Sequence, residues 1–338
     1  MDFDANAKNN KCKGAKDLNA LLKQFPRCVI GTFPSTVRLA STHDGNQFWI
    51  KDDGRCSDVY GGNKVRKLEY LLAEVQRRQM KVLVVHGDVE SHTVQASGIW
   101  ARKAGLEVHA VVFSHRNQSC DVPELSRLRE MGVQVHLRRT MLGAVLHAHW
   151  IGWRRHGYVV PLGASTPLAT LGYVQAAFEL QEQIQAGLLP EPRRIYLPFA
   201  TGGSVGGLLI GLTLAGLATR VVAVQSVEGI IANQKRLERL VKNTLAVLAA
   251  DKDNFRLCLN RLDFIDRKQL GSGYRDVPPQ VAAAVVTARQ NGLQLEPVFS
   301  GKAFAALLEM LPQFPNGELL FWNTHDQHAS LPALEGRQ

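Results

Sequence analysis

Apolar and polar positions along the chain switch between two spacings. Short continuous apolar runs rich in β-branched residues predict strands, and longer segments with an apolar residue every three or four positions predict helices. The predicted strands are 47–51, 81–86, 107–114, 133–137, 195–199, 221–227 and 319–323. The predicted helices are 64–79, 92–104, 122–131, 141–155, 168–186, 204–218, 230–250, 278–291 and 301–311. This alternation predicts an α/β fold with parallel sheets covered by helices on both faces.

The predicted strands form two groups along the chain. One group lies within residues 81–140, and the other begins at 195 and includes the N-terminal strand 47–51. The segment 161–167, rich in Pro, Gly, Ser and Thr, is a natural crossing point between them. Ligands in such folds bind beyond the carboxyl ends of strands, so we expect the chemistry in loops that follow strands. Residues 1–16 are polar and predict a loose tail.

Composition removes several classes of protein. The chain has 338 residues, 45% of them hydrophobic, which is enough for a sizeable core and argues against disorder. The longest apolar run, 206–218, is about a dozen residues, whereas a membrane span needs about 20, so no membrane partner is expected. The net charge is 40 − 30 = +10. The basic residues occur as short pairs with no stripe of interleaved aromatics, so nucleic acid is not expected either.

Cysteine usage predicts a reducing compartment. The chain has 5 cysteines, an odd number at long spacings, and no CxxC pair that would indicate zinc or redox chemistry. The N-terminus lacks the apolar stretch of a signal peptide. We therefore expect a cytoplasmic protein without a metal site.

A glycine-rich segment, Thr-Gly-Gly-Ser-Val-Gly-Gly at 201–207, follows the predicted strand 195–199 and opens an apolar helix. Glycines let backbone N–H groups converge on an anion, and a helix N-terminus adds positive potential. Thr201 and Ser204 add hydroxyl donors. The segment predicts a phosphate-binding loop. Two alternatives stay open: a tight turn with glycines for close packing, and a dinucleotide loop with Glu228 as the ribose-binding acid, although the spacing is not GxGxxG.

A second glycine pair precedes Lys64 in the segment Tyr-Gly-Gly-Asn-Lys-Val-Arg-Lys-Leu-Glu-Tyr at 60–70. Lys64 is expected at a helix start, where the helix potential disfavours a protonated amine and lowers its pKa. Lys67 lies one turn later, and its like charge acts in the same direction. Lys64 is therefore a candidate nucleophile toward a carbonyl carbon, and the alternative is a solvated basic helix face.

Together, the two segments resemble the 1-aminocyclopropane-1-carboxylate deaminase/D-cysteine desulfhydrase family. These are fold-type-II enzymes dependent on pyridoxal phosphate (PLP), in the tryptophan synthase β superfamily. The resemblance runs from about residue 34 to residue 326. Further matching segments are Lys51-Asp52-Asp53, Ser91-His92-Thr93, Leu171-Gly172-Tyr173, the loop 271–274, Pro297-Val298-Phe299-Ser300-Gly301-Lys302 and Asn323-Thr324-His325-Asp326.

The resemblance implies both the architecture and the role of individual residues. It implies two open twisted sheets flanked by helices, a large PLP-binding domain of 1–67 plus 171–338, a small domain of 68–170, PLP in the cleft between them, and a homodimer. The implied catalytic residues are Lys64, Ser91 and Tyr274. The implied cofactor-binding residues are Lys64, Asn63, Lys67, His92, Thr201, Gly202, Gly203, Ser204 and Ser300. The implied substrate-binding residues are Ser91, His92, Thr93 and Tyr274.

Residues 299 and 300 bear on the reaction. Ser300 would face the pyridine nitrogen, and a hydroxyl leaves that nitrogen largely neutral, whereas a carboxylate keeps it protonated. The family pairs the carboxylate with cyclopropane ring opening and the hydroxyl with α,β-elimination. Phe299 also lacks the phenol that the deaminases have there. The resemblance therefore implies elimination from a small amino acid, with D-cysteine giving pyruvate, ammonia and sulfide as the leading reaction.

Departures from the family keep alternatives open. His92 replaces the Asn that contacts the cofactor's 3′-oxygen, and we expect its imidazole to titrate near neutral pH. Asn323, His325 and Asp326 add side chains where the family has a small glycine-rich loop. The alternatives are a 1-aminocyclopropane-1-carboxylate deaminase or another amino-acid lyase or racemase, a PLP-binding protein without turnover, and a nucleotide-binding oxidoreductase.

Overall fold

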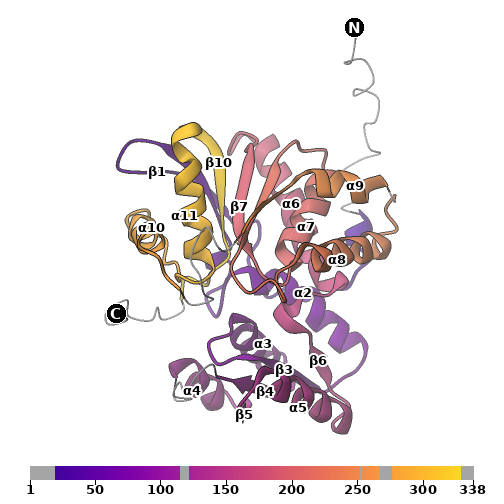
Figure 1. The fold of residues 1–338 in the computed structure, drawn as a ribbon. Coiled ribbons are helices and arrows are strands. Elements are labelled where there is room, and N and C mark those ends of the chain that lie inside the picture. The colour runs from indigo at the N-terminus through magenta and orange to yellow at the C-terminus, as the bar shows by residue number, and fades with distance from the viewer. Residues whose placement is uncertain (1–19, 115–121, 252, 267–275, 329–338) are drawn as a thin grey trace. The chain divides into compact units, whose positions relative to one another are not determined.

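The computed structural model describes residues 20–114, 122–251, 253–266 and 276–328. Within these ranges no helix is both long and apolar enough to span a bilayer. The chain forms two compact units, each built around one sheet (Figure 1). The first unit contains Thr36–Lys51 and Thr170–Trp322, and the second contains Pro26–Ser35, Asp52–Ala169 and the chain from Asn323 onward.

The first unit has a six-stranded sheet in the order β1-β2-β10-β7-β8-β9. Its strands are β1 (Thr36–Ser41), β2 (Gln47–Asp52), β7 (Arg194–Phe199), β8 (Arg220–Gln225), β9 (Leu262–Ile265) and β10 (Asn316–Asn323). Strands β10, β7, β8 and β9 run parallel, with Leu320 opposite Ile195 and Ile195 opposite Val221. The central strands are nearly continuous apolar runs because both of their faces are covered.

Helices cover the two faces of this sheet (Figure 1). They are α6 (Pro167–Gln185), α7 (Gly203–Leu214), α8 (Gln234–Val247), α9 (Asp253–Asn260), α10 (Pro279–Gln290) and α11 (Ser300–Met310). On the face covered by α10 and α11, the Phe304 ring lies 5.4 Å from the ring of Phe48 and 5.0 Å from that of Phe321. Every residue of α7 is buried, which fits a helix that is apolar all round.

The second unit has a four-stranded sheet in the order β5-β4-β3-β6, all parallel. Its strands are β3 (Val82–Asp88), β4 (Glu107–Phe113), β5 (Gln134–Arg138) and β6 (Tyr158–Val160). Its helices are α2 (Asn63–Arg77), α3 (His92–Lys103), α4 (Pro123–Glu130) and α5 (Met141–Arg154). Alternate β3 residues point to opposite faces: Leu83 and Val85 join the core under α2, α3 and α4, while Val82 and Val84 pack against α5.

The predicted α/β fold with two sheets is confirmed, and each predicted strand and helix is present with ends shifted by a few residues. The sequence analysis missed β1, β6, β9 and α9. These elements are short or, in β1 and β9, lie at a sheet edge and are only partly buried, so their apolar signal is weak. The predicted domain limits stay a prediction; the two units differ from them at residues 26–35, 52–67, 170 and from 323 onward.

Candidate active site

The turn before Lys64 is one that only glycine can form. Gly62 is the N-cap of α2 with a φ of 82°, and a Cβ there would lie 2.7 Å from the backbone oxygen of Thr324. A Cβ at Gly61 would lie 2.2 Å from the backbone oxygen of Gly54. Helix α2 therefore begins immediately after the glycine pair, and Lys64 occupies its first turn, as the sequence predicts.

The first five residues of α2 include three cations, and its first turn has no acidic residue, against the usual preference at a helix N-terminus. One cation, Arg66, is matched by a buried carboxylate: its Nε and Nη2 donate to the two oxygens of Asp53 at 2.9 and 2.8 Å. Both side chains are almost fully buried. Lys64 and Lys67 are the other two cations. A local rule broken in this way is typical of a functional site.

Lys67 is buried, and its Nζ donates to the backbone oxygen of Gly163 at 3.2 Å. Burial first, and the charge of Lys64 second, hold the pKa of Lys67 well below its usual value. Lys64 Nζ donates to Oδ1 of Asn63 at 2.9 Å. The lowered pKa of Lys67 favours its neutral form, which reduces the positive charge one turn away from Lys64.

Ser91 and His92 lie at the N-terminus of α3, directly after β3. Ser91 is the N-cap, and its Oγ accepts a hydrogen bond from the backbone N–H of Val94 at 3.5 Å. His92 is the first residue of the helix, and Thr93 is buried in its first turn. The helix start predicted from the sequence is confirmed, and this position suits an anionic group of a ligand.

His92 has a partner that the sequence analysis did not identify. Its Nδ1 lies 2.9 Å from the hydroxyl oxygen of Tyr60. Burial first, and the nearby charge of Lys64 second, lower the pKa of His92 to about 4. The expectation that His92 titrates near neutral pH is therefore wrong, because a buried imidazole beside a cation stays neutral. The signal for Tyr60 was its place immediately before the glycine pair.

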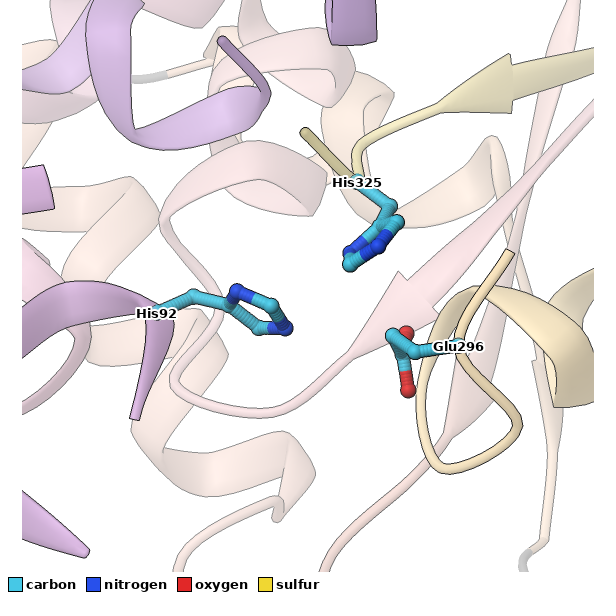
Figure 2. Close-up of side chains that lie close together, drawn as sticks. All are labelled: His92, Glu296 and His325. Carbon is cyan, nitrogen blue, oxygen red and sulfur yellow. The ribbon is translucent and has the colours of Figure 1, made fainter. Parts of the chain in front are cut away.

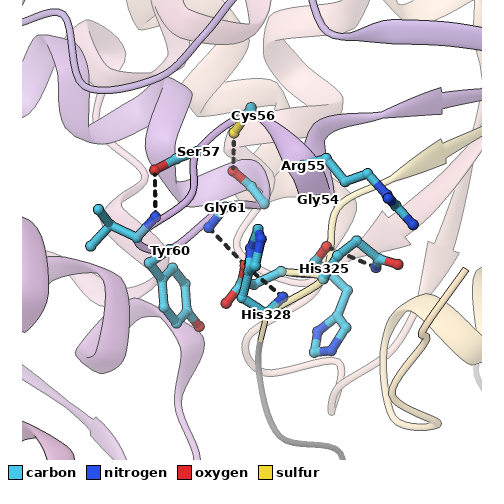
Figure 3. A network of polar contacts seen from close by, with 12 residues as sticks. Gly54, Arg55, Cys56, Ser57, Tyr60, Gly61, His325 and His328 are labelled. Atoms are coloured by element: carbon cyan, nitrogen blue, oxygen red, sulfur yellow. Dashed lines mark hydrogen bonds and ion pairs between the residues drawn. The ribbon is translucent and has the colours of Figure 1, made fainter.

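The loop after β10 is bonded to the lysine segment (Figure 3). The backbone N–H of Gly61 donates to Oδ1 of Asp326 at 2.8 Å, and that of Asn63 donates to the backbone oxygen of Thr324 at 3.0 Å. His325 in the same loop lies beside His92, with ring centroids 4.9 Å apart and an interplanar angle of 78° (Figure 2). Residues that depart from the resembling family thus contact the glycine-rich turn that precedes the predicted lysine.

In the first unit, the glycine-rich segment links β7 to α7. Gly202 is the N-cap of α7 in the left-handed region, with a φ of 90°, and supplies no side-chain cap. Thr201 and Ser204 are buried beside it. A Cβ at Gly207 would lie 2.4 Å from the Cβ of Tyr173 in α6. The segment therefore combines both readings of the sequence: its first glycines form a helix start suited to a phosphate, and Gly207 serves close helix packing.

Ser300 is the first residue of α11 and is fully buried. Its Oγ donates to Oε1 of Glu296 at 2.8 Å. The Glu296 carboxylate also accepts from the backbone N–H groups of Val298, Phe299 and Ser300 at 2.7, 2.8 and 2.6 Å. Burial raises the pKa of Glu296, and these hydrogen bonds oppose the rise. The sequence analysis missed Glu296 because it lies three residues before the N-cap of α11, outside the usual capping position.

The predicted site residues that the structure describes come from both units. The second unit holds Asn63, Lys64, Lys67, Ser91, His92 and Thr93. The first unit holds Thr201, Gly202, Gly203, Ser204 and Ser300. Tyr274 lies outside the described residues. The donor set fits PLP: a helix start without a side-chain cap suits its phosphate, and an amine in a glycine-made turn suits its aldehyde.

Comparison with known proteins identifies a family. The sequence profile described as "Pyridoxal-phosphate dependent enzyme" matches residues 35–324. A D-cysteine desulfhydrase from Serratia proteamaculans is 29% identical over 331 residues, covering 91% of this chain and 96% of the relative. A Pyrococcus furiosus protein assigned by name to 1-aminocyclopropane-1-carboxylate deaminase is 26% identical over 318 residues, covering 91% of this chain and 94% of the relative.

Solved structures give the same fold. The crystal structure of a protein called the ACC deaminase homologue has a TM-score of 0.77 at 25% identity, covering 90% of this chain and 93% of that one. Threonine deaminase isoform 2 from Solanum lycopersicum has a TM-score of 0.64 at 13% identity, covering 94% of this chain and 86% of that one. At this low identity, the similarity to threonine deaminase shows a shared fold and nothing more.

Proposed function

Because the chain belongs to the family of pyridoxal-phosphate dependent enzymes, we propose that it is a lyase acting on a small amino acid by α,β-elimination. The enzyme has the type II fold of this family, and its cofactor is PLP. The leading substrate is D-cysteine, which with one water gives pyruvate, ammonia and hydrogen sulfide. The name of the Serratia relative supports this substrate.

PLP, when bound, withdraws electrons from the Cα of the amino acid and so makes its proton acidic. We assign Lys64 Nζ to binding the cofactor aldehyde and then to accepting the Cα proton. Thr201, Gly202, Gly203 and Ser204 bind the phosphate. Ser91, at the start of α3, orients the substrate carboxylate.

His92 and its neighbours complete the assignment. His92 would donate one hydrogen bond to the cofactor's 3′-oxygen from its neutral imidazole, and Tyr60 fixes its ring. We assign Thr93 to binding the substrate, and Asn63 and Lys67 to binding the cofactor. Tyr274 is proposed as a second proton-transfer residue, on the resemblance alone.

The observation that carries elimination, rather than ring opening, is the hydroxyl at residue 300. Ser300 Oγ is buried and donates its proton to Glu296, so the group that α11 offers at this position is a neutral oxygen. The Glu296 carboxylate is occupied in accepting hydrogen bonds from the turn before α11. A neutral oxygen does not keep the pyridine nitrogen protonated, which favours elimination of a good leaving group.

The second candidate is deamination of 1-aminocyclopropane-1-carboxylate, which the name of the Pyrococcus relative favours. A third is PLP binding without turnover, which the His92 and His325 side chains favour because they add bulk where the resembling family has smaller residues. Membership of the PLP family removes the reason for assigning the glycine loop and Glu228 to a dinucleotide. A homodimer and a cytoplasmic location are proposed from the resemblance alone.

Purified protein loaded with PLP tests these candidates with D-cysteine, L-cysteine and 1-aminocyclopropane-1-carboxylate. We expect sulfide and pyruvate in equal amounts from D-cysteine, at a rate well above 2-oxo acid formation from the cyclopropane acid. Faster turnover of the cyclopropane acid would select the second candidate, and no turnover of any amino acid would select the third. Lys64→Ala should abolish product formation, whereas Lys81→Ala, at an exposed position, should not.

A further inference from the structure

His325 is a buried residue whose ring has no hydrogen-bond partner among the described residues. Its relative exposure is 5%, and neither Nδ1 nor Nε2 contacts a donor or acceptor there. Buried polar atoms in native proteins are nearly always paired, so an unpaired pair of ring nitrogens needs an explanation. A ligand that reaches the ring would provide one.

The main chain around His325 is fixed on both sides, so the ring is held in place. The His325 backbone N–H donates to Oδ1 of Asn323 at 3.1 Å, and Asn323 Nδ2 donates to Oδ1 of Asp52 at 2.7 Å. A Cβ at Gly54 would lie 2.3 Å from the His325 backbone oxygen, so Gly54 lets the loop approach. After His325, Asp326 accepts from the backbone of Gly61.

The neighbours of the ring place it at the proposed amino-acid site. The His92 ring lies 4.9 Å away, edge to face. His92 in turn contacts Tyr60 and lies close enough to Lys64 for that charge to lower its pKa. Burial, with a smaller contribution from His92, holds the pKa of His325 well below its usual value. The ring is therefore neutral near pH 7 and offers one donor and one acceptor.

We propose that His325 hydrogen-bonds the polar β-substituent of the amino-acid substrate and so selects against 1-aminocyclopropane-1-carboxylate. This inference rests on the proposed function and names its substrate class: small amino acids with oxygen or sulfur on Cβ. A cyclopropane ring would leave both His325 nitrogens unpaired in a buried site. Sites built to hydrogen-bond a substrate discriminate strongly against analogues that lack the group.

Two variants separate the nitrogens of His325 from its bulk. His325→Phe keeps an aromatic ring without nitrogens, and His325→Gln keeps one donor and one acceptor. We expect His325→Phe to lower the ratio of kcat/KM for D-cysteine to that for 1-aminocyclopropane-1-carboxylate by about tenfold to a hundredfold. His325→Gln should keep most of the kcat/KM ratio of the unaltered enzyme. His43→Gln, at a fully exposed ring, is the matched control and should leave the ratio unchanged.

A binding measurement gives a second readout that does not depend on turnover. PLP-loaded Lys64→Ala protein, labelled with ¹⁵N-histidine, is titrated with D-serine and with D-alanine, which lacks the β-substituent. We expect D-serine to shift the His325 ring resonances and to bind about tenfold more tightly than D-alanine. In the His325→Phe protein in the same background, the two amino acids should bind alike.

The outcomes distinguish this inference from the proposed function. Elimination from D-cysteine by the unaltered enzyme, with an unchanged ratio in His325→Phe, would overturn the role of His325 and leave the proposed function intact. No elimination by the unaltered enzyme would refute the proposed function. The D-serine and D-alanine titrations would then test the role of His325 by themselves. Equal affinities for the two amino acids would contradict that role. A poorly folded His325→Phe would leave the His325→Gln and binding results to decide.

Discussion

The hydroxyl of Tyr60 lies 2.9 Å from Nδ1 of His92, so the residue before the glycine pair fixes the ring of the residue that begins α3. The backbone oxygen of Tyr60 also accepts from Nε1 of Trp100 at 3.2 Å. One residue thus connects the lysine turn to the body of α3. The neutral imidazole of His92 is oriented by a neutral phenol rather than by a charge.

Tyr60→Phe should disturb His92 without displacing the main chain, because the bond from Trp100 to the Tyr60 backbone remains. A single hydrogen bond contributes about 1 kcal/mol, so kcat/KM should fall roughly fivefold to tenfold. The measurement is steady-state kinetics together with the ¹⁵N resonances of the His92 ring. Tyr158→Phe, on β6, is the control. Unchanged kinetics and unchanged ring resonances would show that the Tyr60 hydroxyl does not orient His92.

Arg66→Ala should destabilise the protein far more than the loss of an exposed arginine. Asp53 would be left as a buried carboxylate without its bidentate partner, at a cost of about 3–5 kcal/mol. Arg77→Ala breaks an ion pair with Glu74 in the same helix, but Arg77 is 60% exposed and water screens the pair, so the loss of stability should be much smaller. Urea unfolding followed by tryptophan fluorescence measures both. Similar losses for the two variants would contradict the role given to the Arg66–Asp53 pair.

Two adjacent glycines of α7 should respond oppositely to alanine. A Cβ at Gly207 would lie 2.4 Å from the Cβ of Tyr173, so Gly207→Ala forces α6 and α7 apart and should lower stability by about 1–3 kcal/mol. A Cβ at Gly206 would meet side chains at 3.4 Å, an ordinary contact. Alanine there should be neutral or stabilise by up to about 1 kcal/mol through helix propensity. Thermal unfolding of the two variants checks the contrast, and equal destabilisation would refute it.

Stability should fall as pH decreases from about 6.5 toward 4. The folded pKa of His92 is about 4, against 6.5 for an unperturbed imidazole, so the unfolded chain takes up a proton before the folded one does. Within the described part of the second unit, the groups next to His92 are Lys64, Tyr60 and His325, and none of these three is a carboxylate that would favour protonation. For His92 alone, the free energy of unfolding should be roughly 3 kcal/mol lower at pH 4 than at neutral pH.

Urea unfolding at a series of pH values measures this dependence. His92→Asn removes the titrating group, so the decline between pH 6.5 and 4 should become shallower. His43→Gln, at an exposed ring, should leave it unchanged. If the free energy of unfolding of His92→Asn and of the unaltered protein fell equally between pH 6.5 and 4, His92 would not contribute to the pH dependence of stability.

Local sequence patterns were enough to predict the sheets, the main helices and the two glycine segments. Lys64 falls in the first turn of α2 because glycines, which mark turns, stand directly before an amphipathic helix. Ser91 falls at the N-cap of α3 because serine is favoured there. In each example, the signal and the structure involve residues close together in the chain.

Contacts between distant segments could not be predicted in this way. The bond from the Gly61 backbone to Asp326 joins residues 265 positions apart, and it forms only because the segment that follows β10 folds beside the lysine turn. The pairing of Arg66 with Asp53 likewise depends on where η1 (Asp53–Arg55) places its first residue. The pKa of His92 depends on burial, which one residue's identity does not reveal. The sequence therefore pointed to His325 as a departure but could not show that its ring is buried and unpaired.

The attachment of PLP to Lys64 is the central claim, and borohydride reduction tests it most directly. The PLP-loaded protein is reduced, digested, and mapped by mass spectrometry, with Lys67→Ala and Lys64→Ala proteins treated in parallel. We predict loss of the cofactor absorption band and a pyridoxyl group on Lys64 in both the unaltered and the Lys67→Ala proteins, with none at this position in Lys64→Ala. A pyridoxyl group on Lys67 or another lysine, or no modified peptide from fully loaded protein, would contradict the account.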